Sequence, residues 1–469
     1  MFKREDGYLM QFVFVLIVLF GIFAVFSMNT ARTSMNLVDV TIDNEKSLYY
    51  AEAGLNRYLY FLNADELFYL TEQSKQMVNK DIPFEDGYYR LQVFPPTDGS
   101  RILKVRSTGW VENGRKVTVE GEFTKDGFPD YVFGTNSEQL ASGQEIWWAD
   151  GDIVNGNLHT NGTLYIQGRP IFNGRVSYST GINIQKGSNP QFNSGPPIKA
   201  RILEFPPTDD KIKNEAIANG YYFRGRTCIM VRGDRLIIRD RTGKIEDLPL
   251  PPNGVIYVDS INNSIDKFGL DTGNVFISGE LDGRLTIAAK NNIYITGYDP
   301  TKWEHPEQLT DKDRTKGIVY AKTPDDPECD DMLGLIAGKN VEILHYGWLK
   351  DDGGWPESET RSERIGMFWR NVTVENDVAI NDINIHAAIF TLNGSFGFEK
   401  YDKGPYKGYI NFVGSMFQNR RGAVGLVGRT NGYSKNYTYD ERMRSVAPPN
   451  FIEPENAKWY IRNWGRISN

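Results

Sequence analysis

The sequence holds few of the residues from which metal, thiol and nucleotide sites are usually built. Two cysteines occur in 469 residues, and no CxxC spacing joins them, so structural zinc, iron–sulfur and thioredoxin-like sites lack support. The four histidines form no HExxH motif, and neither a Walker-type phosphate loop nor a GxSxG elbow is present. We therefore predict no catalytic residue, no metal ligand and no cofactor, and expect a protein that is not an enzyme.

An excess of positive charge is also missing. Lysine and arginine together number 53 against 60 acidic residues, which gives a net charge of −7. Proteins that bind nucleic acid usually present a basic face, so this balance argues against a nucleic-acid partner. Glycine, with 46 residues, and aromatic residues, at 13 %, are plentiful. Together they indicate many turns and many strands.

Long apolar runs are absent except near the N-terminus, which excludes a multi-span transporter or channel. Residues 8–28 hold 18 apolar residues of 21 and no charge. At ~1.5 Å per residue this run spans about 31 Å, the thickness of a bilayer core. The sequence therefore predicts a single membrane helix, residues 8–28, joined to a large polar body.

The flanks of this run leave three interpretations: a cleaved secretory signal, an uncleaved anchor or a prepilin leader. A secretory signal would have a shorter apolar run followed by a small-x-small cleavage site. Here the run continues without proline up to Pro83. Apolar residues then recur at helical intervals, which predicts an amphipathic continuation over 29–80 with a break near residue 64. In it, Ala51, Ala53 and Gly54 would let another backbone approach closely.

The chain begins with a charged leader, residues 1–7, that ends in Gly7. An aromatic residue and about twenty apolar residues follow, and they continue into a predicted helix that contains the sequence AEAGLN. This arrangement resembles type IV pilin-like proteins of the PilX-like minor-pilin class. The resemblance covers roughly the first sixty residues. It implies that prepilin peptidase cuts after Gly7, that Tyr8 becomes the N-methylated terminus, and that the helix packs against other pilin-like subunits.

One residue departs from the family pattern. Most major pilins carry a glutamate at the fifth mature position, where this chain has Phe12. Together with the large body, this departure points to a minor, initiating or tip subunit. The expected location is the inner membrane, with an extracytoplasmic body that reaches the cell surface or pilus after assembly. The alternative is a surface protein held by an uncleaved anchor.

The rest of the chain has the short alternating runs of β-strands. Residues 81–130 predict a small antiparallel unit. Over 131–427 the runs shorten and recur every eight to twelve residues in the clearest stretches, with Asn-Gly or Gly turns between them. Short strands with two inward side chains each are typical of a parallel β-helix. Residues 428–469 are predicted to cap its open end.

The predicted fold class is therefore mainly β. It comprises a long N-terminal pilin-like α-helix, a small antiparallel sheet and a right-handed parallel β-helix-like solenoid. Because Asn-Gly dipeptides are also hairpin signals, a β-sandwich is the alternative. Segments 149–162, 331–344 and 428–464 are similar to an uncharacterised bacterial ectodomain family found behind pilin-like helices, from which no activity carries over.

Two further sets of residues are candidates for function. Trp348 and Trp355 stand in a loop rich in glycine and charge, where aromatic side chains stack on sugars or dock proteins. They are predicted to form a contact surface, with a surface glycan as a possible ligand. Cys228 and Cys329 could form a disulfide if the body is extracytoplasmic. The second functional hypothesis is an anchored β-helix protein that binds or cleaves polysaccharide.

Overall fold

The computed structural model describes residues 6–97, 99–112, 114–304, 308–365, 368–426, 428 and 430–467. Of the predicted leader, residues 1–5 lie outside this set, and Asp6 and Gly7 begin the first helix. The structure is mainly β, with one long N-terminal helix and a large sheet. It divides into a helix–sheet unit (Met1–Thr97, Ile102–Lys125 and Lys458–Asn469) and a parallel-strand unit (Asp98–Arg101 and Asp126–Ala457).

The first helix, α1 (Asp6–Ala64), contains no proline and is 59 residues long. Its most apolar 18-residue window has a mean hydropathy of 2.8, so it is long and apolar enough to cross a membrane. Residues 9–42 are exposed all round apart from half-buried Leu16. From residue 47 onwards one face is buried, at helical spacing. The buried side chains on this face are Ser47, Tyr50, Ala51, Leu55, Tyr58 and Leu62.

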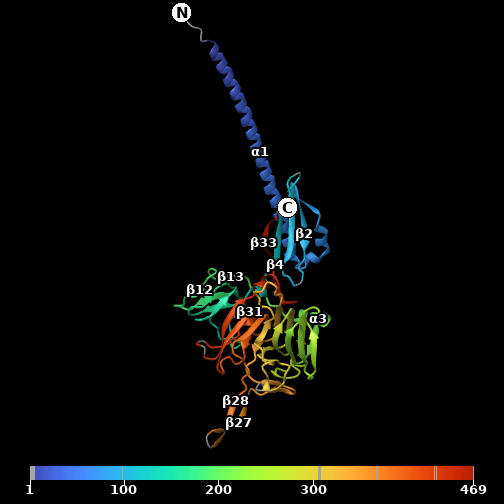
Figure 1. Ribbon diagram of the computed structural model, residues 1–469, viewed down its shortest axis with the longest axis vertical. Helices are drawn as coiled ribbons and strands as arrows, with labels where there is room; N and C mark the ends of the chain where they lie inside the picture. Colours follow the sequence, from blue (N-terminus) through green and yellow to red (C-terminus); the bar gives the residue numbers. More distant parts are fainter. Residues whose placement is uncertain are drawn as a thin grey trace. The chain divides into compact units, whose positions relative to one another are not determined.

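That buried face packs on an antiparallel sheet (Figure 1). The sheet has the order β1 (Asp81–Phe84), β2 (Gly87–Phe94), β3 (Leu103–Val111), β4 (Val117–Lys125) and β33 (Trp459–Ile467). Two short helices, η1 (Phe68–Leu70) and α2 (Glu72–Met77), precede it. The C-terminal strand β33 pairs with β4, so residues 459–467 complete this sheet. The sequence had predicted a different place for this segment, as part of a cap on the solenoid formed by residues 428–469.

The parallel-strand unit is built mostly from strands of two to nine residues. Its first part contains η2 (Phe128–Asp130), β5 (Phe133–Ser137), β6 (Ile153–Asn155), β7 (Leu158–Thr160), β8 (Thr163–Ile166), β9 (Ile171–Phe172), β10 (Val176–Tyr178), β11 (Gly181–Ile184), β12 (Gln191–Phe192) and β13 (Ile198–Lys199). The middle part contains α3 (Asp210–Asn219), β14 (Tyr221–Arg224), β15 (Thr227–Gly233), β16 (Arg235–Arg239), β17 (Ile245–Pro249), β18 (Val255–Asp259), β19 (Val275–Leu281), β20 (Arg284–Ala289), β21 (Ile293–Ile295) and β22 (Gly317–Tyr320). The last part contains β23 (Met332–Ala337), β24 (Val341–Ile343), β25 (Trp348–Lys350), β26 (Gly353–Trp355), β27 (Ser358–Ile365), β28 (Phe368–Glu375), β29 (Ile383–Thr391), β30 (Phe396–Phe398), β31 (Tyr406–Arg420), β32 (Gly432–Tyr439) and η4 (Glu441–Arg444).

These strands stack side by side in parallel ladders. The first ladder has the order β14-β18-β20-β23-β29-β31-β5-β7-β10-β13. The second has the order β15-β19-β22-β29-β31-β32-β6-β9-β12. Shorter ladders join β19-β21-β24-β30 and β8-β11. The apolar side chains that these strands turn inward form one large core.

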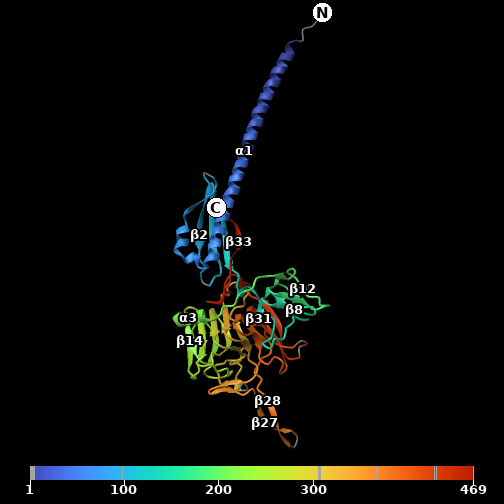
Figure 2. The same ribbon diagram turned by 180° about the vertical axis from the view of Figure 1, so that it is seen from behind.

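The order of the ladders differs from the order of the chain. The chain enters at β5 in the middle of the first ladder, builds outwards to β13, and resumes at the opposite end with β14. It then returns strand by strand until β31 lies beside β5. Figure 2 shows this arrangement, with β14 on one side, β12 on the other and β31 between them.

The Asn-Gly dipeptides at 155–156, 161–162, 173–174 and 393–394, all in the parallel-strand unit, close no hairpins among the described strands. Asn155-Gly156, for example, joins β6 to β7, which belong to different ladders. The asparagine side chains stack instead: Asn193 Nδ2 donates to Asn173 Oδ1 at 2.6 Å, and Asn173 Nδ2 donates to Asn155 Oδ1 at 2.7 Å. Antiparallel pairs occur where segments leave the ladders, at β15-β16-β17, β25-β26 and β27-β28. The last of these is the hairpin at the bottom of Figure 1.

Candidate functional site

The predicted tryptophan surface is largely buried. Trp348 and Trp355 face each other across the β25-β26 pair. Trp348 is only 1 % exposed, and its ring lies 3.5 Å from that of Tyr298; Trp355 is half-buried. The prediction that Trp348 is an exposed contact residue is wrong, because the hairpin folds onto an apolar cluster that includes Phe276 and Leu344. The tryptophans with the greatest described exposure are Trp369 at 71 % and Trp464 at 51 %, and no local pattern in the sequence distinguished them.

The two cysteines are free and buried, so the disulfide that the sequence left open is not formed. Cys228 lies in β15, where burial raises the pKa of its thiol to about 11. Cys329 lies just before β23, and its Sγ donates to the carbonyl oxygen of Lys322 at 3.2 Å. The tertiary arrangement gives each thiol its own surroundings, which sequence spacing does not reveal.

The small residues of α1, Ala51, Ala53 and Gly54, pack within the helix–sheet unit. Ala51 is fully buried, Gly54 is buried and Ala53 is half-buried. A Cβ atom on Gly54 would lie closer than 3.0 Å to the Ser107 hydroxyl and the Tyr89 ring. Side chains of the chain's own strands therefore pack against Gly54, and the backbone of Ala51 lies close to Gly109 of β3. Gly7 and Tyr8 are helical, at the start of α1.

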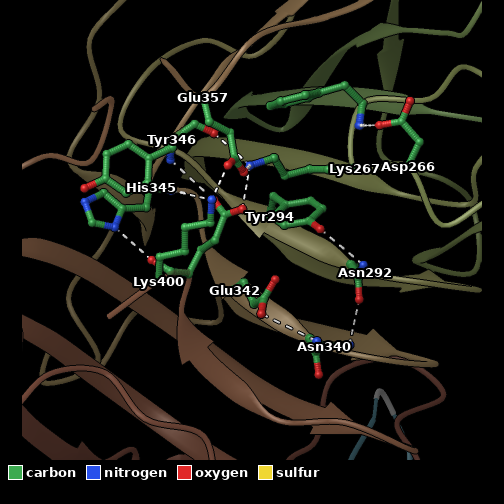
Figure 3. Close-up of polar contacts among 12 residues, drawn as sticks. Asp266, Lys267, Asn292, Tyr294, Asn340, Glu342, His345, Tyr346, Glu357 and Lys400 are labelled. Carbon is green, nitrogen blue, oxygen red and sulfur yellow. Dashed lines mark hydrogen bonds and ion pairs between the residues drawn. The ribbon is translucent and has the colours of Figure 1, made fainter. Parts of the chain in front are cut away.

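The ladders bring together a polar cluster that the sequence did not predict, shown in Figure 3. We call Lys267, Glu342, His345, Glu357 and Glu399 the Lys267 cluster. The ammonium group of Lys267 donates to the Tyr346 carbonyl oxygen at 2.8 Å, to Glu357 at 3.0 Å and to Glu399. Glu399 also accepts the backbone N–H of His345 at 3.1 Å. The cluster ties the segment before β19 to the ends of β24 and β30.

Glu342 is the member of this cluster with an altered acidity. It lies in β24 and is half-buried. Burial, with the nearby Glu399 carboxylate adding to it, raises its pKa to about 7, although Lys267 opposes the change. A neutral carboxyl beside an ionised one is the pairing that acid–base catalysis uses. Here the Glu399 carboxyl group accepts from Lys267, and the raised pKa means that Glu342 holds its proton up to near neutral pH.

This proton makes stability depend on pH. In the unfolded chain a glutamate loses its proton near pH ~4.3, whereas Glu342 in the folded chain does so at about 7. The folded state therefore binds more protons in this window, and the free energy of unfolding falls as the pH rises through it, by on the order of 2 kcal/mol. Glu342→Gln imitates the protonated form and should remove this loss.

Urea denaturation of the detergent-solubilised protein at about pH 5 and about pH 8 measures the difference. The exposed Glu328→Gln is the matched control. It should leave the pH dependence as it is in the unaltered protein. A Glu342→Gln protein that keeps the full loss of stability between the two pH values would contradict the assignment.

Three acidic groups also meet just before the first residues of β20 and β23. Carboxylate oxygens of Asp282, Asp330 and Asp331 lie within 4.8 Å of one another, close enough to hold a metal ion. Asp282 and Asp330 are exposed. Asp331 is buried, and its two oxygens accept the backbone N–H groups of Gly283 at 2.7 Å and Lys322 at 3.0 Å. These bonds give Asp331 a structural role.

A small pocket of about 160 Å³ lies beside β32. Its lining includes Trp147, Asp150, Asp152, Arg421 and Lys435. Burial by itself would raise the pKa of Asp152, but Lys435, 3.0 Å away, and Arg421 hold it below its usual range. Charged donors and acceptors beside an aromatic ring can bind the hydroxyl groups of a sugar.

Comparisons of the chain with protein-family models, with curated proteins and with solved structures find no match.

Proposed function

We propose that the protein is a membrane-anchored, pilin-like minor subunit with a structural and interaction role in a pilus or secretion filament. The observation that carries this proposal is the division of α1. Residues 9–42 have no packing partner within the described chain, whereas residues 47–62 bury one face on an antiparallel sheet. An exposed apolar helix requires lipid or other apolar helices around it. A helix divided in this way supports storage in the inner membrane followed by packing into a filament.

The parallel ladders support the finer description of the body as a three-sided solenoid. In turns such as β7-β8-β9 and β20-β21-β22 the chain passes from the first ladder through a shorter one to the second. Stacked asparagines at one corner and a continuous apolar interior agree with such a coil. We take the coil to be right-handed, as parallel connections nearly always are. The solenoid would present its loops to the cell exterior.

Binding of a surface glycan is a second candidate function. The pocket that Trp147, Asp150 and Arg421 help to line favours it, because it combines an aromatic side chain with hydrogen-bond donors and acceptors. This function is compatible with a tip subunit. Cleavage of a glycan is not proposed.

Removal of the leader tests the pilin assignment. Gly7→Ala should block the cut by prepilin peptidase, so that the protein retains Met1 and lacks an N-methylated Tyr8. Gly21→Ala is the matched control, because a Cβ there meets nothing within 4 Å. Intact-mass analysis of both variants and of the unaltered protein, from cells with active prepilin peptidase, reads out the leader directly. An unaltered protein that retains residues 1–7 would refute the assignment.

A further inference from the structure

The two ends of the stacked ladders are built differently. At one end β15 is covered by the antiparallel strands β16 and β17. At the other end β11, β12 and β13 each pair on one side only, with β8, β9 and β10, among the described strands. We call residues 181–199, which contain these three strands, the open end. A solenoid normally has a polar cap at such a position.

The backbone at the open end presents hydrogen-bonding groups that the ladders do not use. The N–H groups of Gln185, Asn193 and Ala200 donate back to the preceding layer at 2.8–2.9 Å. Successive N–H groups of a strand point to opposite sides. Those of Ile184, Phe192 and Lys199 therefore point away from the stack, to the side on which no described strand lies. Such an edge is a template for a further strand.

Side chains at the open end also have no further layer of described strands to pack against. Phe192 stacks on Phe172, with ring centres 5.3 Å apart, and no described residue continues the stack. Ile184 is 42 % exposed and Ile198 is 44 % exposed. Deeper in the same ladders the corresponding side chains, such as Ile166, are fully buried. An added strand would cover this apolar surface.

Charge decides which strand fits. No acidic residue occurs between Asp152 and Glu204. Four basic side chains in this stretch are exposed and form no ion pair with a described residue: Arg169, Arg175, Lys186 and Lys199. Two open ends brought together would repel each other, and lysines on an edge discourage self-pairing. A negatively charged segment is attracted instead.

We propose that the open end binds an extended acidic segment of a partner polypeptide as an added β-strand. The added strand pairs with β11, the longest of the three strands at the open end. Backbone hydrogen bonds to its free edge give affinity, an apolar side chain covers Ile184, and acidic side chains meet exposed Lys186. An acidic polysaccharide would share the charge but cannot reproduce the alternating N–H and C=O groups of a strand. This inference does not depend on the pilin assignment.

A pair of synthetic peptides tests the proposal on the full-length protein in detergent. The probe is fluorescein-labelled VEVTVEVE, and its control has the same sequence with alternate backbone nitrogens methylated. The unmethylated peptide should bind at least tenfold more tightly by fluorescence anisotropy. It should also slow hydrogen exchange at Ile184, the β11 amide that points away from the stack and exchanges rapidly without the peptide. Equal binding of the two peptides, or no binding of either, would overturn the proposal.

Charge variants and a glycan complete the test. The double variant Lys186→Glu/Lys199→Glu should weaken peptide binding at least tenfold, whereas Lys211→Glu, an exposed lysine of α3, should not change it. Polygalacturonate is the acidic glycan probe and should leave exchange at the Ile184 amide unaltered. Protection of the Ile184 amide by polygalacturonate, or equal weakening of peptide binding by Lys211→Glu, would refute strand addition at this edge.

Discussion

Replacing Arg421 by methionine should lower the free energy of unfolding of the parallel-strand unit by about 3–5 kcal/mol. The Arg421 side chain is 1 % exposed and pairs with Glu138, whose side chain is fully buried, at 2.7 Å. Its guanidinium also lies 3.9 Å from the ring centre of Trp148. Glu138 has one other described side-chain partner, the hydroxyl of Thr135. Removal of the arginine therefore leaves an almost uncompensated carboxylate inside the protein, which is costly.

The double variant Arg421→Met/Glu138→Gln separates charge from packing. It should recover most of the lost stability, because no unpaired charge remains, and the two substitutions should be strongly non-additive. Arg241→Met is the matched control, since Arg241 and Asp271 form a pair of similar length, 3.0 Å, with side chains 42 % and 40 % exposed. That substitution should cost less than ~1 kcal/mol. Equal losses for Arg421→Met and Arg241→Met in urea denaturation would show that the buried pair contributes no more than the exposed one.

Replacing Gly109 by alanine should detach the second half of α1 from its sheet. A Cβ atom at this position in β3 would lie closer than 3.0 Å to the backbone of Ser47 and Ala51. Backbone atoms of a regular helix cannot move aside separately, so the helix and the strand must separate. We expect a loss of about 3 kcal/mol in the helix–sheet unit, at the upper end of the range for overpacking.

Hydrogen exchange at Tyr50, Leu55 and Tyr58, which are buried against this sheet, measures the loss locally. Exchange at these amides should accelerate by roughly a hundredfold, the equivalent of about 3 kcal/mol. Gly465→Ala in β33 of the same sheet is the control, because nothing lies within 4 Å of its added Cβ, and it should leave the exchange rates unchanged. Rates in Gly109→Ala that match those of the control would show that the close approach is unimportant.

The features that could be predicted from the sequence depend on neighbouring residues. The absence of charge over residues 8–28 and of proline before Pro83 predicts one long helix, and α1 confirms it. The short alternating runs after residue 81 predict a mainly β body, which the structure also confirms. The small residues around Gly54 indicated a close backbone approach, although the sequence did not identify the partner as the chain's own sheet.

The candidate sites depended on distant residues and were poorly predicted. Glycine and charge around Trp348 suggested exposure, but the β25-β26 pair places it over Tyr298. The Lys267 cluster draws on segments more than a hundred residues apart, from Lys267 to Glu399. The residues next to Lys267 and Glu399 in the sequence are those of ordinary polar turns, so no local pattern indicates a cluster. Only the stacking of the ladders brings the two turns together.

By itself, then, the sequence determined the membrane-length helix and the strand-rich body, since helix and strand periodicity are local properties of the chain. Only the tertiary structure decided which strands lie side by side: β5 beside β31, β33 beside β4, and β13 at an open end. The physical reason is that a strand with two inward apolar side chains fits beside many others of the same kind. Which strands pair depends on the complete stack: on loop lengths, on buried ion pairs such as that of Arg421 and Glu138, and on the packing of all inward side chains into one core.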